Sequence, residues 1–182
     1  MGVAFAKLWA RFRTQEFKVV VVGLNNAGKT TTVYKLHLGE VVVTSPTIGS
    51  NVEEVTCPDK PNVKFQMWDL GGQDSLRQSW ATYYANTTAV ILVIDSTDRE
   101  RVDVIRKELY GMLEHDDLAS AVLLVFANKQ DVKGAMPPGE ISTALGLHTL
   151  KNREWHIEGS CALTGQGLDE GLRWIASRTA AA

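Results

Sequence analysis

The residues best suited to chemistry lie directly after the first apolar run of the chain. Two glycines five positions apart are followed by a lysine and a threonine, which fits the pattern GxxxxGK[ST]. Glycine lets backbone N–H groups approach a phosphate closely, the lysine adds positive charge, and the threonine hydroxyl can bind Mg²⁺. The pattern therefore predicts a nucleotide-phosphate site formed by Gly23, Leu24, Asn25, Asn26, Ala27, Gly28, Lys29, Thr30 and Thr31.

A second candidate follows the apolar run that ends at Trp68. Asp69 leaves this run where a carboxylate could hold Mg²⁺ directly or through water, opposite the phosphate loop. Gly72 could bring a backbone N–H to the last phosphate, and Gln73 is then placed to orient an attacking water. Alone, this segment could equally be a plain turn. After a phosphate loop it becomes a catalytic candidate.

A third candidate, Asn128-Lys129-Gln130-Asp131, follows another apolar run. A carboxylate can accept hydrogen bonds from both N1–H and the exocyclic amine of guanine, an edge that adenine lacks, so Asp131 would select the base. Asn128 would tie this loop to the phosphate loop, and the stem of Lys129 would cover the purine. A weaker fourth segment contains Cys161 and Ala162, where the Ala162 N–H could meet the guanine carbonyl oxygen.

Strand-like and helix-like segments alternate along the chain, which predicts an α/β fold with a parallel sheet covered on both faces. Continuous β-branched runs predict central strands at 19–22, 90–94 and 122–126, and a further strand is expected at 155–158. Segments 51–56 and 63–68 predict an antiparallel hairpin, joined by a loop that contains Pro58 and Pro61. Helical periodicity fits residues 29–38, 102–114, 138–146 and 168–178.

The composition limits the class of protein. A chain of 182 residues is of single-domain size. Its 19 basic and 21 acidic residues give no electrostatic reason to bind nucleic acid. Two distant cysteines argue against a disulfide framework or a zinc site, the longest apolar runs are too short for a membrane span, and no secretory signal is evident. We therefore expect a cytoplasmic protein and, in solution, a monomer.

The four segments, in this order, resemble the small GTPases of the ADP-ribosylation factor (Arf) and Arf-like family. The similarity is carried by PTIGSNVE (46–53), WDLGGQD (68–74) and NKQD (128–131), and it covers nearly the whole chain. It implies a P-loop fold with a six-stranded, mostly parallel sheet, binding of GTP or GDP with Mg²⁺, and slow GTP hydrolysis. It also implies that Thr47 closes on Mg²⁺ and the last phosphate, beside Thr30 and, through water, Asp69, so that Lys29, Thr47 and Gln73 form the catalytic set.

The resemblance also implies partners. Two switch segments would order in the GTP state, and the hairpin between them would slide by two residues, which preserves the facing of its side chains. Effectors would contact a surface that includes Ser50, Trp68, Trp80 and Tyr83, although such aromatics can equally be core residues. An exchange factor is expected because both the base and the phosphates of the nucleotide are bound, which slows its release. A GTPase-activating protein is expected because no arginine finger can be assigned within the chain. Vesicle traffic at Golgi membranes is the implied setting.

Two departures from the family pattern concern the phosphate loop and the hairpin. The family usually has Asp where this chain has Asn25, and an amide removes repulsion toward phosphate. The hairpin tip at 57–62 is a few residues longer than usual.

Residues 1–16 form a separate N-terminal segment before the GTP-binding domain at 17–179, and residues 180–182 form a frayed tail. Large apolar residues at positions 5, 8, 9 and 12, with cationic neighbours, predict an amphipathic helix. Gly2 is placed for N-myristoylation, although Ala6 departs from the strict motif and the family resemblance carries this expectation. A single acyl chain binds membranes weakly, so the helix would supply the second anchor. Docking of this helix on its own domain is an alternative, especially with GDP.

Two other functions remain open at this point. A metabolic kinase of the P-loop class would use the same phosphate loop, but the NKQD segment and the lack of an arginine-rich lid argue against it. A GTP-binding scaffold without hydrolysis is left open by Asn25.

Overall fold

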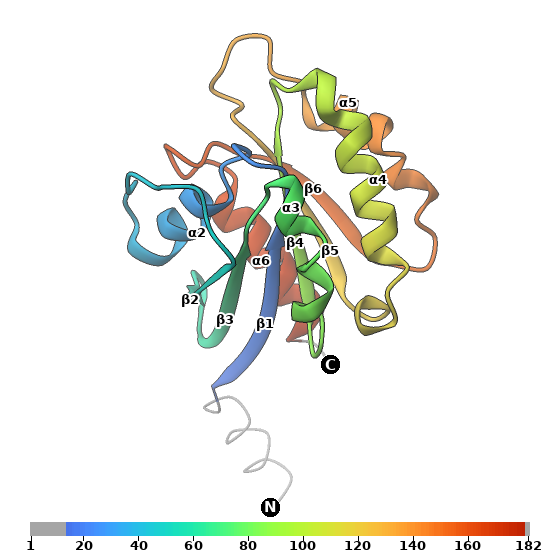
Figure 1. The fold of residues 1–182 in the computed structure, drawn as a ribbon. Helices are drawn as coiled ribbons and strands as arrows, with labels where there is room; N and C mark the ends of the chain where they lie inside the picture. Colours follow the sequence, from blue (N-terminus) through green and yellow to red (C-terminus); the bar gives the residue numbers. More distant parts are fainter. Residues whose placement is uncertain (1–13, 181–182) are drawn as a thin grey trace, which may run out of the picture.

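In the computed structural model, which describes residues 14–180, a single six-stranded sheet runs through the molecule (Figure 1). The strands lie in the order β2-β3-β1-β4-β5-β6. Neighbouring strands are parallel except β2 and β3, which pair antiparallel, so the predicted mostly parallel sheet is confirmed. The strands are β1 (Gln15–Val22), β2 (Ser50–Cys57), β3 (Lys60–Leu70), β4 (Ala89–Asp95), β5 (Val122–Asn128) and β6 (Trp155–Gly159).

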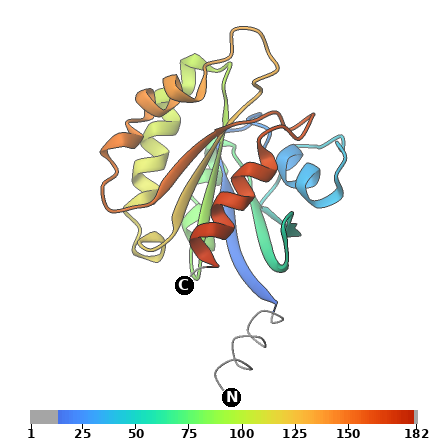
Figure 2. The same cartoon turned by 180° about the vertical axis from the view of Figure 1, so that it is seen from behind.

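Helices connect the parallel strands and cover both faces of the sheet (Figures 1 and 2). The four predicted helices form within a residue of their expected ends, because glycines in the left-handed conformation end two of them, at Gly39 and Gly146. The α-helices are α2 (Lys29–Leu38), α3 (Asp74–Arg77), α4 (Val102–Leu113), α5 (Pro138–Leu145) and α6 (Leu168–Thr179). Short 3₁₀ helices are η1 (Trp80–Tyr83), η2 (Arg99–Arg101), η3 (Asp116–Leu118) and η4 (Leu147–Thr149).

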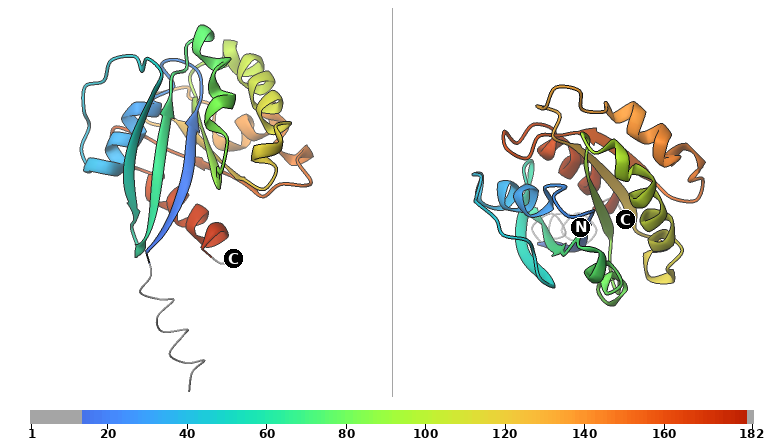
Figure 3. Two further views of the ribbon diagram at one scale, coloured as in Figure 1. Left: turned by 60° about the horizontal axis from the view of Figure 1, so that its bottom comes forward. Right: turned by 45° about the horizontal axis from the view of Figure 1, so that its top comes forward.

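Alternate residues of β1 point into two different cores. Val20 and Val22 belong to the core under α4 and α5, whereas Val19 and Val21 belong to the core under α2 and α6. Figure 3 shows from two further angles that α4 and α6 lie on opposite sides of the sheet. Because both faces are covered, the central strands must be apolar at every position, which is the pattern that identified them.

The hairpin between β2 and β3 differs from the prediction at its tip. Strand pairing continues to Cys57 and Lys60, so the connection is only two residues long and Pro61 lies inside β3 rather than in a loop. Proline is tolerated there because β1 pairs with β3 only from Val63 onward, and the ladder to β2 shifts register after Thr56.

The boundary of the N-terminal segment also needs correction. Gln15 and Glu16 belong to β1 and pair with Val63 and Lys64, so the domain begins two residues earlier than expected. Gly2 and the expected amphipathic helix lie outside the described residues, as do the last two residues of the tail. Across positions 14–180, none of the helices has the length and apolar character needed to cross a membrane.

The carboxyl ends of β1, β3, β4 and β5 lie along one edge of the sheet, since these strands are parallel. Ligands of open α/β sheets bind at this edge, in the loops that follow the strands. The four segments singled out by their chemistry lie at or directly after the carboxyl ends of β1, β3, β5 and β6, whereas Thr47 precedes β2.

Candidate functional site

The loop between β1 and α2 borders a cavity of about 350 Å³. Gly28, which precedes α2, has a φ of 92°, and a Cβ there would lie 2.4 Å from Nδ2 of Asn128. Only glycine fits this position, and it leaves the N-terminus of α2 open to an anion. The cavity is lined by Asn25, Asn26, Gly28, Lys29, Thr30, Thr31, Thr44, Ser45, Pro46, Thr47, Gly72 and Gln73.

Lys29 is the buried cation of this cavity, with 6% of the residue exposed. Its Nζ donates to the carbonyl oxygen of Leu24 at 3.0 Å. Burial lowers the pKa of Lys29 to about 8, and the nearby charge of Asp69 opposes this shift. A phosphate beside the ammonium group would favour its charged form.

Three side chains from three segments meet at Asp69, which is fully buried. Its Oδ2 accepts hydrogen bonds from the hydroxyls of Thr30 at 2.5 Å and Thr47 at 3.2 Å, and these two hydroxyls lie 2.9 Å apart. Burial raises the pKa of Asp69, while the hydrogen bond from Thr30 and the charge of Lys29 oppose this.

The other carboxylate oxygen of Asp69, Oδ1, is buried and has no hydrogen-bond partner among the described residues. One carboxylate and two hydroxyls, with a buried oxygen left over, form the all-oxygen donor set that Mg²⁺ prefers beside phosphate. The residues predicted for the metal therefore come together, and their chemistry fits a magnesium ion.

The two glycines after Leu70 contact different segments: Gly72 lies against the phosphate loop and Gly71 against the segment before β2. The Asn25 N–H donates to the carbonyl oxygen of Gly72 at 3.1 Å, and the Gly71 N–H donates to the carbonyl oxygen of Gly49 at 3.0 Å. A Cβ on Gly72 would lie 2.4 Å from the carbonyl oxygen of Gly23, so this approach requires glycine. Gln73 is exposed, precedes α3 and lines the cavity, as expected for a residue that meets water.

A second cavity, of about 150 Å³, adjoins the first and shares Gly28 and Thr31 with it. Asn128 is 2% exposed, and its side chain donates to the Ala27 carbonyl oxygen at 2.9 Å and accepts from the Ala162 N–H at 2.9 Å. The predicted tie between the two loops is therefore present. The other lining residues are Lys129, Asp131, Val132, Ala162 and Leu163.

An ion pair that the sequence did not indicate holds Lys129. Its Nζ lies 2.6 Å from Oδ2 of Asp95, at the end of β4, and its backbone has a left-handed φ of 66°. Burial alone would raise the pKa of Asp95, but hydrogen bonds from Lys129 and Thr97 hold it below its usual value. The pair fixes the lysine stem at the wall of the second cavity.

Some predicted residues lie elsewhere. Cys161 is buried, its N–H donates to the Gln166 carbonyl oxygen, and it does not line either cavity, so Ala162 and Leu163 form that wall. Leu24, within the phosphate loop, lines a different, small and mainly apolar cavity instead of the first one. The first cavity also includes Thr44, Ser45 and Pro46. None of these was predicted to line the site, although Pro46 belongs to the segment 46–53 that carries the family resemblance.

The predicted switch surface is only partly on the surface. Trp68 and Tyr83 are half-buried neighbours with ring centroids 5.9 Å apart, and Ser50 is also half-buried. Trp80 is 3% exposed, and its indole N–H donates to the Gly71 carbonyl oxygen at 2.9 Å. For Trp80 the surface prediction is therefore corrected to a core position that supports the glycine loop.

Comparisons with known proteins agree with this geometry. The model of the ADP-ribosylation factor family matches residues 2–179. ADP-ribosylation factor-like protein 5A of Bos taurus is 59% identical over 178 residues, which cover 98% of each chain. ADP-ribosylation factor-like protein 5 of Dictyostelium discoideum is 58% identical, covering 95% of this chain and 93% of its own.

A solved structure is similar as well. The Arl6 BBS3 small GTPase of Trypanosoma brucei, with the bound nucleotide analogue GppNp, superposes with a TM-score of 0.84 at 34% identity. The match covers 92% of this chain and 99% of that one.

Proposed function

The chain belongs to the ADP-ribosylation factor family of small GTPases, and from that premise we propose that it is a GTP-controlled switch that recruits effector proteins to membranes in Golgi and vesicle traffic. The family resemblance of the motifs is confirmed. As a member of this family the protein binds guanine nucleotides and hydrolyses GTP to GDP and phosphate. The kinase and the non-hydrolysing scaffold are therefore set aside.

One observation carries the proposal of a switch. Thr47, from the segment before β2, and Gly72, from the segment after β3, both contact the phosphate loop at the same cavity. A terminal phosphate in this cavity would contact both segments, and its loss would remove a contact from both. Segments ordered in this way by a γ-phosphate are the usual moving parts of a nucleotide switch.

The roles within the site follow from its donors. We infer that Thr30, Thr47 and, through water, Asp69 hold Mg²⁺, which when bound would neutralise phosphate charge. Lys29 would bind the β- and γ-phosphates, and Gln73 would orient the attacking water. Asn128 and Asp131 would hold the base, with Lys129 against its face.

The membrane part of the proposal depends on residues 2–14, which precede β1. Their apolar stripe and an acyl group on Gly2 would together anchor the protein, and release of this segment would be coupled to GTP binding. The protein would then be cytoplasmic and peripheral on intracellular membranes, Golgi membranes in particular. An exchange factor and an activating protein would set the timing of the cycle. The half-buried Trp68, Tyr83 and Ser50 would form part of the surface that contacts the effector.

The experiment is co-sedimentation of the myristoylated protein with liposomes. The protein is loaded with GDP or with a slowly hydrolysed GTP analogue, and an ATP analogue serves as the control. We expect sedimentation with the GTP analogue, little with GDP and none that depends on the ATP analogue. Deleting residues 2–14, which stops short of β1, should abolish binding to the liposomes without affecting nucleotide loading.

A substitution tests whether the switch segment transmits the signal. Thr47→Ala should bind liposomes equally in both nucleotide states, because the contact with the phosphate cavity is lost. Thr56→Ala, an exposed threonine on β2, is the matched control and should behave as the wild type. Equal liposome binding of the wild type with GDP and with GTP would refute nucleotide control of the membrane.

A further inference from the structure

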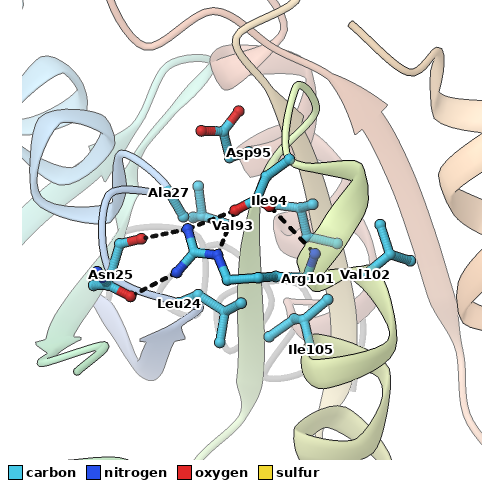
Figure 4. Close-up of a pocket in the computed structure, with 10 residues that line it drawn as sticks. Leu24, Asn25, Ala27, Val93, Ile94, Asp95, Arg101, Val102 and Ile105 are labelled. Atoms are coloured by element: carbon cyan, nitrogen blue, oxygen red, sulfur yellow. Dashed lines mark hydrogen bonds and ion pairs between the residues drawn. The ribbon is translucent and has the colours of Figure 1, made fainter. Parts of the chain in front are cut away.

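Arg101, at the end of η2, reaches from the start of α4 to the phosphate loop (Figure 4). Its Nη1 donates to Oδ1 of Asn25 at 2.7 Å, and its Nη2 donates to the backbone carbonyl oxygen of the same residue at 3.3 Å. One guanidinium group therefore contacts both the side chain and the backbone of Asn25. The two residues are 76 positions apart in the chain, and neither sequence pattern nor spacing pointed to the contact.

Asp98 holds the guanidinium group in place. The Nε of Arg101 donates to Oδ2 of Asp98 at 2.5 Å, while Oδ1 of Asp98 accepts from the Arg101 N–H at 3.2 Å. The stem of Arg101 lies beside Leu24, Val102 and Ile105 at a small cavity (Figure 4). A planar group with several fixed donors can make all these contacts at once, which the ammonium group of lysine cannot.

The contact fixes the direction of a peptide plane in the phosphate loop. In a trans peptide the C=O and the following N–H point in opposite directions, and no cis peptide occurs among residues 14–180. Because the Asn25 carbonyl points toward Arg101, the N–H of Asn26 points away from it. Asn26 has a left-handed φ of 65° and lines the phosphate cavity, so a fixed plane here serves phosphate binding.

The same contact lies at the outer end of the phosphate cavity. The cavity beside Asp131 and the phosphate cavity share Gly28 and Thr31, whereas Asn25 lines the phosphate cavity with Gly72 and Gln73 and does not line the cavity beside Asp131. A nucleotide with its base beside Asp131 would therefore direct its last phosphate toward the part of the phosphate cavity that Asn25 lines with Gly72 and Gln73. Arg101 and Asp98 cancel in charge, so the neutral amide of Asn25 leaves this end without net negative charge.

Resting on the proposed function, we propose that Arg101 is a positioning residue of the phosphate loop and that its contact with the amide of Asn25 favours GTP over GDP. Arg101 orients the loop, and Asn25 accepts its hydrogen bond without adding a carboxylate beside the γ-phosphate.

The test is the ratio of the dissociation constants for GDP and for a slowly hydrolysed GTP analogue, measured with Mg²⁺ for each variant. Asn25→Asp has nearly the same shape but adds a negative charge, and we expect it to lower the preference for GTP roughly tenfold. Arg101→Ala and Arg101→Lys should both lower the preference for GTP. Alanine removes the guanidinium group, and lysine keeps the charge but lacks its planar set of donors. Arg99→Ala is the matched control, since Arg99 lies in the same turn and pairs instead with Glu140; it should leave the ratio unchanged.

The outcomes separate the two proposals. An unchanged ratio in Asn25→Asp and Arg101→Ala, with both nucleotides still bound, would overturn this inference and leave the proposed function intact. A wild-type ratio in Arg101→Lys would overturn the role of the planar guanidinium group. If the wild-type chain bound neither nucleotide, the proposed function itself would fail. Should Arg101→Ala not fold, Asn25→Asp decides the question.

Discussion

Asn128 bonds to Ala27 across 101 positions of sequence, its Nδ2 lying 2.9 Å from the Ala27 carbonyl oxygen. The same side chain accepts from the Ala162 N–H, so one buried amide joins the phosphate loop, the loop after β5 and the loop after β6. The walls of the two neighbouring cavities are thus linked through a single residue.

Replacing Asn128 should weaken the binding of every guanine nucleotide. Asn128→Ala leaves the Ala27 carbonyl and the Ala162 N–H without this partner, and an unsatisfied buried group costs about 1–3 kcal/mol. We expect GDP and GTP affinities to fall by roughly 10- to 100-fold together, measured by fluorescence of a labelled nucleotide. A loss confined to GTP would contradict the idea of a common support for both cavities.

Asp131 should select the base through its carboxylate. Asp131→Asn removes the charged acceptor for the N1–H and amino groups of guanine, and we expect roughly a 10- to 100-fold loss of GTP affinity. Xanthine carries a carbonyl in place of the amino group, so the new amide should favour xanthosine nucleotides. Asp169→Asn, an exposed position on α6, is the control. If the variant kept its preference for guanine, another group would have to select the base.

Gln73 should act on hydrolysis rather than on binding. It lines the outer end of the cavity and is exposed, so Gln73→Leu removes a group that orients water but no contact of the buried cluster at Asp69. A misplaced reactant can cost roughly 100-fold in rate, and we expect a loss of that size in single-turnover phosphate release, with GTP affinity unchanged. Gln78→Leu, at the other end of α3, controls for the added apolar surface. A normal rate in Gln73→Leu would rule out the assigned role.

The central strands and the phosphate loop could be predicted from the sequence, because each needs particular residue types at particular positions. Strands covered on both faces are apolar throughout, as at Val19 to Val22, and the glycine at position 28 has no substitute beside Asn128. The polar residues then had to follow the strands, which fixed the edge of the sheet at which they meet.

What could not be predicted depends on tertiary contacts. Arg101 and Asp95 have nothing in their neighbourhoods along the chain to connect them with Asn25 or Lys129, and only the packing of α4 and β4 brings them there. Trp80 has the residue type of a surface anchor, but it packs in the core under α4 and α5, where its indole N–H donates to the Gly71 carbonyl oxygen. Proline is typical of loops, so Pro61 predicted one. The structure instead places Pro61 near the start of β3, where β1 does not pair with the strand.

The ion pair of Asp95 and Lys129 should make the free energy of unfolding fall at acidic pH. The folded pKa of Asp95 lies below its unfolded value of about 3.9, so its contribution is complete above that pH and is lost as the pH falls through the folded pKa. Asp95→Asn should cost about 1 kcal/mol at pH 7 and flatten the decline of stability below about pH 4, as measured by denaturant unfolding at each pH. Asp116→Asn, an exposed carboxylate, should keep the wild-type slope. A steeper decline in Asp95→Asn would reverse the sign inferred here.

Two helical glycines should respond oppositely to the same added methyl group. A Cβ on Gly171 of α6 would lie 2.6 Å from ring carbons of Phe126 and 2.9 Å from Leu124, whereas a Cβ on Gly111 of α4 would meet nothing within 4 Å. Alanine favours a helix over glycine by about 1 kcal/mol, so Gly111→Ala should stabilise the protein by up to that amount. Gly171→Ala should instead destabilise it by about 1–3 kcal/mol, because α6 must move away from the sheet. Urea unfolding of both variants measures the difference, and a change of the same sign in both would mean that α6 does not pack this closely on β5.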